Sequence, residues 1–295
     1  MDIFIGIVEQ GLTYAYLAVG LYFAYIILDF PDLTVDGSFP LGGAITAAAI
    51  LAGLNPFAAL LLSMAGGAVA GLLTGLIHVK LGIKDLLAGL IMQTALYTVN
   101  LTIAQQASVV LFNQQTIYSN GLIDSLFGGG LAPYRVLLVT LPLVIILKLI
   151  IDAFLKTKRG FLLRATGDNP LLVQTMGKDP GMSKILGLSI SNALVAFSGG
   201  LVVQESRVFN ITMGTGAMVM GLASLVIGLK LLGKLTGVKD TTKVIVGSIV
   251  YKASIALAIA IGLSANSLKL VTALIFLVIL FSGNSRKLRR RMKDA

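Results

Sequence analysis

The chain has 295 residues, of which 56% are hydrophobic and only 12% are charged. A soluble domain carries roughly 25% charged residues, so this composition excludes an ordinary water-soluble protein. The chain has no cysteine, which excludes disulfides, thiol catalysis and thiolate metal sites. Its net charge of +10 would suggest nucleic acid as a partner of a soluble protein. Membrane topology explains the charge better, and we expect no nucleic-acid partner.

Apolar runs recur along the whole chain, and most are long enough to cross about 30 Å of hydrocarbon as a helix. The 33 glycines suit close packing between such helices. The sequence therefore predicts an all-α, polytopic membrane protein with about 8–9 transmembrane helices, in a single transmembrane domain over residues 1–295. The apolar segments, in chain order, are 5–28, 40–54, 56–79, 85–103, 133–155, 185–203, 214–232, 243–262 and 267–282.

The second apolar segment, 40–54, is short, and residues 29–40 before it are too polar to face lipid. Two interpretations stay open for this part of the chain. The segment is either re-entrant, or it spans the membrane and its first part is unwound inside the protein.

Basic residues gather in four clusters, and counting spans places all four on one side of the membrane. An excess of Lys and Arg marks the cytoplasmic side, so we expect the C-terminus and the basic tail, 284–295, in the cytoplasm. The opposite loops, 104–132, 204–213 and 263–266, are poor in Lys and Arg. The clusters are His78, Lys80 and Lys84; Lys156, Lys158, Arg159, Arg164, Lys178 and Lys184; Lys230, Lys234, Lys239 and Lys243; and Arg286, Lys287, Arg289, Arg290, Arg291 and Lys293.

The central segment, 156–184, is polar and basic and lies between two long apolar runs. Gly160 and Gly167 are expected to interrupt regular structure in its first half. Asp168 or Asn169 suits the N-cap of a helix that follows.

Pro170 suits the first turn of that helix, and Gly177 is a natural stop. We predict a short amphipathic helix over 168–177 on the cytoplasmic face. One interpretation is a connector that only carries positive charge. The other is a lever that enters a groove on a cytoplasmic motor and transmits its closure.

The motif Arg164-Ala165-Thr166-Gly167-Asp168-Asn169, followed by Met176-Gly177 and by residues 187–194, resembles the permeases of bacterial ATP-binding cassette (ABC) importers. The similar branch transports branched-chain amino acids and ribose-type sugars. The resemblance implies a multi-pass protein of the bacterial plasma membrane. It also implies a homodimer that works with two copies of a separate ATPase and with an extracellular or periplasmic substrate-binding protein.

The resemblance further implies a coupling role for the central segment and no cofactor on this chain. The chain departs from the family after the coupling glycine, where Lys178-Asp179-Pro180 replaces the usual aliphatic residue. The surface of the ATPase that it fits is therefore open. The expected ATPase-coupling residues are Arg164, Ala165, Gly167, Asp168, Asn169, Pro170, Met176, Gly177 and Asp179.

A narrower resemblance is carried by Asp32-Leu33-Thr34-Val35-Asp36-Gly37-Ser38-Phe39 and by Leu41-Gly42-Gly43-Ala44. These residues are similar to a subgroup of permeases encoded beside a binding lipoprotein and an ATPase. The resemblance implies an amino acid as the solute, aromatic (tryptophan or tyrosine) or branched-chain.

Two stretches, 34–53 and 212–228, each run from a glycine-rich break into a helix of small residues. They lie five spans apart, which predicts an inverted repeat with halves 5–103 and 185–282. Broken helices in inverted repeats are typical of transporters, and the pathway lies near the repeat interface. The candidate pathway residues are Asp36, Gly37, Ser38, Gly42, Gly43, Gln93, Asn192, Thr212, Gly214, Thr215 and Gly216.

We expect no catalytic group and no ATP site on this chain. Residues 228–234 match the first seven positions of a phosphate-binding loop, but Leu235 stands where that loop needs Ser or Thr. Lys148 and Lys252 lie in apolar runs, where they either snorkel or face polar neighbours. An ion-coupled secondary transporter or channel is the alternative, which usually needs intramembrane carboxylates or a broken-helix ion site.

Overall fold

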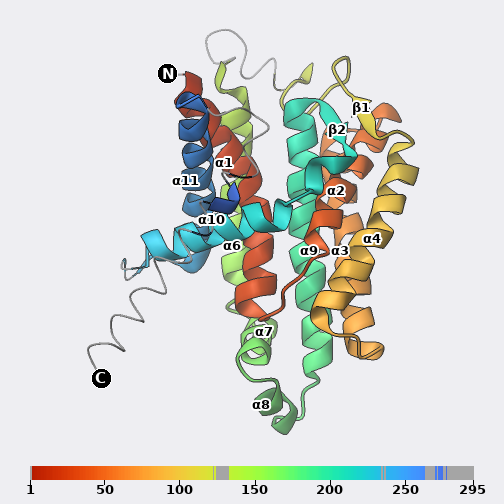
Figure 1. Cartoon of the computed structure of the whole chain (residues 1–295), viewed down its shortest axis with the longest axis vertical. Helices are drawn as coiled ribbons and strands as arrows, with labels where there is room; N and C mark the ends of the chain where they lie inside the picture. Colours follow the sequence, from red (N-terminus) through yellow and green to blue (C-terminus); the bar gives the residue numbers. More distant parts are fainter. Residues whose placement is uncertain are drawn as a thin grey trace.

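The computed structural model describes residues 2–121, 123, 133–233, 235, 237–262, 270, 272–274 and 277. Among these residues almost all regular structure is helical (Figure 1). In chain order the elements are α1 (Asp2–Leu21), the π-helix η1 (Tyr22–Ile27), α2 (Val35–Leu51), α3 (Pro56–Lys80), α4 (Asp85–Ala104), β1 (Ser108–Val110), α6 (Arg135–Phe154), α7 (Lys158–Asp168), α8 (Pro170–Thr175), α9 (Pro180–Ser206), β2 (Val208–Asn210), the 3₁₀-helix η3 (Ile211–Gly214), α10 (Ala217–Leu231) and α11 (Asp240–Ala260).

Seven helical segments in the described residues are long and apolar enough to cross a membrane, and α2 is a shorter apolar helix. The predicted all-α, polytopic membrane fold is therefore confirmed. Each of the first eight predicted apolar segments coincides with a described α-helix, and the first, 5–28, also includes η1. The ninth, 267–282, lies mostly outside the described residues, and the basic tail, 284–295, lies wholly outside them.

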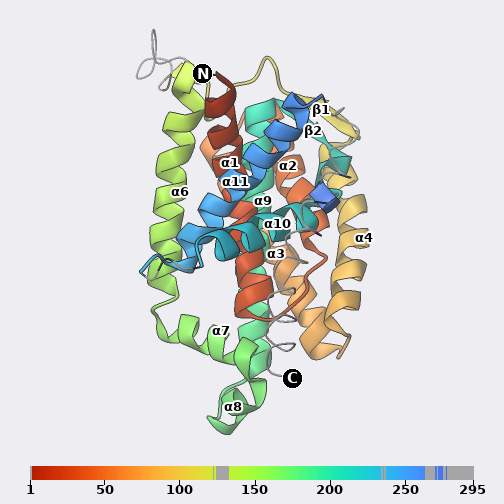
Figure 2. The same ribbon diagram turned by 60° about the vertical axis from the view of Figure 1, so that its left-hand side comes forward.

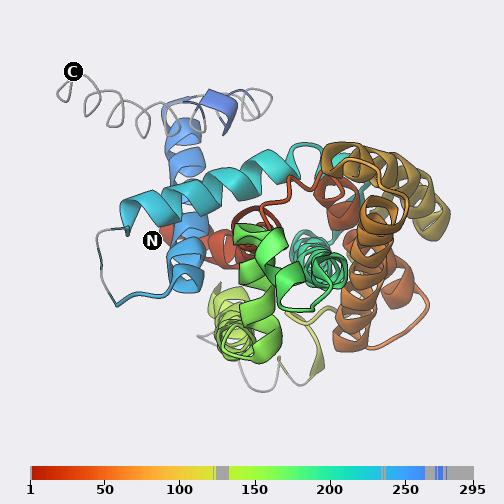
Figure 3. The same ribbon diagram turned by 90° about the horizontal axis from the view of Figure 1, so that it is seen from below.

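Helix α9 forms the centre of the bundle, and Figure 3 shows it end-on with α1, α2 and α3 around it. Its packing against α3 depends on three glycines, Gly67, Gly71 and Gly75, which share one face because they are four residues apart. A Cβ added at Gly67 or Gly71 would overlap carbonyl oxygens of α9, and at Gly75 it would meet the Ile185 Cα. The two backbones can approach this closely only because α3 has small residues there.

Helix α2 begins at Val35, five residues before the predicted start of the second apolar segment, so Pro40 lies inside it. The predicted boundary was wrong because the helix is initiated from buried residues upstream. The Asp32 carboxylate accepts a hydrogen bond from the Thr34 N–H at 2.9 Å, and both residues are buried. Residues 29–34 before α2 are non-helical and mostly packed inside the protein, whereas 35–40 are helical, and both interpretations of the segment, re-entrant and spanning, stay predictions.

The two ends of the molecule differ in their loops (Figures 1 and 2). At one end β1 pairs antiparallel with β2, which joins two of the loops poor in Lys and Arg, 104–132 and 204–213. At the other end lie α7 and α8. There Lys184 Nζ lies 3.1 Å from His78 Nε2, so two of the basic clusters meet.

Candidate functional site

The central segment forms two helices, α7 and α8, at one end of the molecule (Figure 2). The prediction of one short helix over 168–177 was therefore incomplete. Asn169 separates the two helices because its backbone is extended, with φ −157° and ψ 93°. Thr157 caps the start of α7 through its side chain, which accepts a hydrogen bond from Gly160 N at 3.3 Å.

Gly160 and Gly167 do not interrupt the chain as expected, since both lie inside α7. Their small size serves packing. A Cβ at Gly167 would overlap the carbonyl oxygen of Ile27 in η1, and one at Gly160 would lie 2.6 Å from the Cα of Leu155. The glycines thus seat α7 directly against the ends of η1 and α6.

Helix α8 is bounded as the sequence predicts. Asn169 accepts a hydrogen bond from Leu172 N at 3.2 Å, which identifies Asn169 rather than Asp168 as the N-cap. At the other end Gly177 N bonds to the Gln174 carbonyl at 2.9 Å, and Lys178 N bonds to the Val173 carbonyl at 3.1 Å. These two bonds, with φ +71° at Gly177, form a Schellman motif, which favours glycine at this position.

Helix α8 turns an apolar face outward. Val173 is fully buried beneath it, while Leu171, Leu172 and Met176 are exposed. Asp179 fixes the exit of the chain into α9, because its carboxylate accepts a hydrogen bond from Gly181 N at 2.8 Å. A short capped helix with exposed apolar side chains is a surface suited to a protein partner.

The two glycine-rich breaks predicted at 34–53 and 212–228 meet in the structure. The Asp36 carboxylate of α2 accepts hydrogen bonds from Gly216 N at 3.2 Å and from Met218 N at 2.8 Å, so it caps the start of α10. A carboxylate is stabilised there by the unpaired N–H groups of the first helical turn. Gly214 lies so close that an added Cβ would overlap the Asp36 carbonyl oxygen.

A cavity of about 440 Å³ lies beside this junction, between α2, α4 and η3. Its volume falls within the range of roughly 300–1,000 Å³ typical of small-molecule sites. Asn100 is buried in its wall and donates a hydrogen bond to the Gly37 carbonyl at 3.0 Å. The Asn100 Oδ1 has no partner among the described residues. The lining residues are Asp36, Gly37, Pro40, Leu90, Gln93, Thr94, Tyr97, Asn100, Ile211, Thr212 and Thr215.

Five candidate pathway residues line this cavity, namely Asp36, Gly37, Gln93, Thr212 and Thr215. Sequence reasoning missed Thr94 and Tyr97 because neither stands near a glycine-rich break. The α4 lining residues at 90, 94, 97 and 100 recur at spacings of three or four, so helical periodicity was the signal available for Thr94 and Tyr97.

The remaining candidates do not line the cavity. Asn192 accepts a hydrogen bond from Ser38 Oγ at 2.7 Å and donates one to the Asp32 carboxylate at 2.7 Å, and all three side chains are buried. Asp32 was not among the predicted site residues. Gly42 packs against Ala196, and Gly43 against Val203 and Met213. Gly214 and Gly216 lie at the junction itself.

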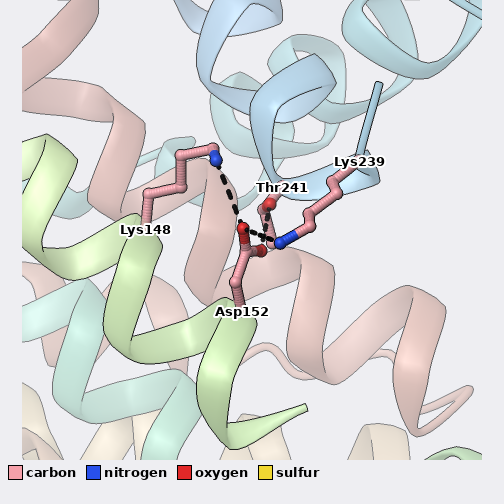
Figure 4. Close-up of polar contacts among 4 residues, drawn as sticks. All are labelled: Lys148, Asp152, Lys239 and Thr241. Atoms are coloured by element: carbon pink, nitrogen blue, oxygen red, sulfur yellow. Dashed lines mark hydrogen bonds and ion pairs between the residues drawn. The ribbon is translucent and has the colours of Figure 1, made fainter. Parts of the chain in front are cut away.

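A polar cluster joins α6 to the start of α11 near α7 (Figure 4). The Asp152 carboxylate lies 3.2 Å from Lys148 Nζ and 2.8 Å from Lys239 Nζ, and it accepts a hydrogen bond from Thr241 Oγ1 at 2.7 Å. Lys148 was expected either to snorkel or to face polar neighbours. In the structure it faces a polar neighbour, Asp152. Arg164 lines a 340 Å³ cavity together with Asp152 and Lys239.

Lys252 also faces a neighbour inside the bundle. Its Nζ lies 3.5 Å from the centroid of the Tyr14 ring. At this distance a cation is attracted by the negative face of the ring. Lys252 therefore contacts an aromatic side chain of α1.

The family model "Branched-chain amino acid transport system / permease component" matches residues 3–282. The chain is 39% identical to a tyrosine transport system permease protein of Clostridioides difficile, over 95% of this chain and 91% of the relative. It is 32% identical to an uncharacterized protein of Rickettsia prowazekii, over 96% and 98% of the two chains. It is 31% identical to a probable branched-chain amino acid transport permease protein LivH of Methanocaldococcus jannaschii, over 63% and 61%.

Proposed function

This chain belongs to the permease family of branched-chain amino acid transport systems, and from that membership we propose its solute, its partners and its mechanism. As a permease of ABC amino-acid importers, it forms the translocation pathway through the membrane. The solute that we propose is an aromatic amino acid, with tyrosine first. The name of the Clostridioides difficile relative, at 39% identity, supports that choice.

The exposed apolar face of α8 is the observation that carries the mechanism. Leu171, Leu172 and Met176 protrude from a helix whose two ends are fixed by Asn169 and Gly177. Docking this helix in a groove of the cytoplasmic ATPase would remove these side chains from water. That burial favours binding by roughly 25 cal/mol for each Å² of apolar surface. ATP-driven closure of the ATPase then moves α8, and with it α7 and η1, against which Gly167 packs.

The cavity at the junction of α2 and α10 is the proposed solute route. Gln93, Thr94 and Thr212 provide hydrogen-bonding groups, and Tyr97 provides an aromatic ring. The Asp36 carboxylate holds the start of α10 in place, so a change at the cavity is transmitted to α10.

The proposed assembly is a homodimer of this permease with two copies of a separate ATPase and an extracellular substrate-binding protein. ATP hydrolysis takes place on the ATPase, and this chain contributes no catalytic group or cofactor. The protein lies in the bacterial plasma membrane, with α7, α8 and the C-terminus in the cytoplasm. The loops joined by β1 and β2 lie outside, where they can meet the binding protein.

The mechanism is tested by placing a charge on α8. Met176→Glu puts a carboxylate in an apolar interface, where its desolvation is costly. In liposomes that contain the permease, its ATPase and the loaded binding protein, we expect tyrosine-stimulated ATP hydrolysis to fall about tenfold or more. Leu81→Glu is the matched control, since Leu81 is 69% exposed and Met176 is 67% exposed.

Two outcomes would reject the proposal. The first is unchanged stimulated hydrolysis in Met176→Glu. The second is accumulation of solute by the permease alone, driven by an ion gradient, which would establish the secondary transporter instead. Binding of a panel of amino acids and sugars to the cognate binding protein tests the choice of solute separately.

A further inference from the structure

A groove of about 550 Å³ lies between α3, α7 and α9, next to the end that carries α8. It is distinct from the solute cavity and shares no lining residue with it. Its floor is apolar and includes Leu72 of α3 and Leu186 of α9. Met182, also in the lining, is exposed, so the groove is open on the outside of the bundle.

The depth of the groove decides what kind of molecule can occupy it. Leu72 lies eight residues before the end of α3 at Lys80, and Ser189 lies nine residues after the start of α9 at Pro180. At 1.5 Å per residue, the floor extends about 12–14 Å from those helix ends. Both helices are long and apolar enough to span a membrane, which would place Leu72 and Ser189 within its apolar part.

The polar groups at the groove divide into satisfied and unsatisfied ones. Ser189 Oγ donates to the Ala68 carbonyl at 2.8 Å, and the Asp179 carboxylate accepts from Gly181 N at 2.8 Å. Arg159 and Lys178 line the mouth and are exposed, without an ion pair or side-chain hydrogen bond in the described part of the chain. The groove thus combines an apolar floor with two available cations, Arg159 and Lys178, and one carboxylate, Asp179, whose Oδ1 is bonded to Gly181 N.

We propose that this groove binds an anionic phospholipid. Its phosphate lies between Arg159 and Lys178, and one acyl chain lies along Leu72, Met182 and Leu186. That the lipid comes from the cytoplasmic leaflet rests on the orientation given under the proposed function. Basic groups beside membrane helices attract anionic headgroups, and an apolar floor accepts the chain.

The position of the two cations gives the lipid a structural role. Arg159 is the second residue of α7, and Lys178 directly follows the glycine that ends α8. One phosphate between them ties the first turn of α7 to the exit of α8. The lipid therefore braces the segment that we propose to be moved by the ATPase.

Native mass spectrometry of the purified, delipidated permease tests the site. We expect phosphatidylglycerol to bind more tightly than phosphatidylcholine, and the double variant Arg159→Gln/Lys178→Gln to bind phosphatidylglycerol about 30-fold more weakly. Lys80→Gln/Lys84→Gln is the matched control, because it removes the same charge from two exposed lysines outside the groove. It should bind as the wild type does.

A second pair of variants tests the floor. Leu72→Trp fills the groove and should weaken phosphatidylglycerol binding. Leu73→Trp should leave it unchanged, since Leu73 is 43% exposed, close to the 40% of Leu72, and does not line the groove. Glycerophosphate, which lacks acyl chains, should not compete.

Several results would overturn the proposal. They are equal binding of both lipids, no effect of the Arg159→Gln/Lys178→Gln variant, or effective competition by glycerophosphate. A Met182→Cys variant that forms a disulfide-linked dimer in membranes would assign the groove to a second copy of the chain. Protection of that cysteine from maleimide by added ATPase would assign it to the ATPase.

Discussion

The Asp152 carboxylate contacts three side chains, that of Lys148 in α6 and those of Lys239 and Thr241 at the start of α11. Asp152→Asn would leave Lys148 and Lys239 without their carboxylate. Removing one member of a buried ion pair costs about 3–5 kcal/mol. Because the Lys239 side chain is 51% exposed, solvent screens part of that cost. We expect the free energy of unfolding to fall by about 1–3 kcal/mol, measured as a lower Tm in detergent.

Asp240→Asn is the control for this substitution. Asp240 is half-exposed and pairs with Lys243 at 2.9 Å, three residues along the same helix. Exposed pairs contribute about 0–1 kcal/mol, so the Tm of Asp240→Asn should stay close to that of the wild type. Equal decreases in the two variants would show that Asp152 has no special role.

Single residues were predicted best where the relevant contact is local. The cap at Asn169 and the stop at Gly177 involve neighbours within a few positions, and the structure confirms both. The bond from Gly216 N to Asp36 joins residues 180 positions apart. The sequence placed both residues in the pathway list but could not show that one caps the helix of the other.

Among the helices, the pairing of α3 with α9 is the most sensitive to side-chain size. Gly71→Val would force the backbones apart, because even a Cβ overlaps the Leu188 carbonyl oxygen. We expect a loss of at least about 2 kcal/mol of stability, in line with overpacking of a tight core. The measurement is the fraction of monodisperse protein after heating, determined by size-exclusion chromatography. Gly6→Val in α1 should be tolerated, since an added Cβ there meets nothing within 4 Å; a similar loss would refute the packing argument.

Long apolar elements could be predicted because hydrophobic length alone identifies them. Helix α7 was missed for a physical reason. Glycine usually lowers helix propensity, so Gly160 and Gly167 suggested interruptions. In the folded chain the same residues allow α7 to contact η1 and α6, and this tertiary contact outweighs the local preference. The inverted repeat over 5–103 and 185–282 stays a prediction.

For the whole molecule, orientation in the membrane can be tested because the chain has no cysteine. Single cysteines introduced as Val110→Cys in β1 and Met176→Cys in α8 lie at opposite ends, and both positions are exposed. In intact cells an impermeant maleimide should label the Val110→Cys variant only. Met176→Cys should react only after permeabilisation, and the wild type provides the blank. Labelling of Met176→Cys in intact cells would reverse the proposed orientation.

The short ladder between β1 and β2 restricts how the bundle can move. It follows α4 and α9 directly, and its register joins Ser108 to Asn210 and Val110 to Val208. Arg207 adds a hydrogen bond to the Phe112 carbonyl at 2.8 Å. Separating the C-terminal ends of α4 and α9 would break these bonds, whereas tilting the two helices about the ladder would preserve them. We therefore expect the end of the bundle that carries β1 and β2 to act as a pivot during transport. The widest displacement should occur at the opposite end, where α9 begins after α8.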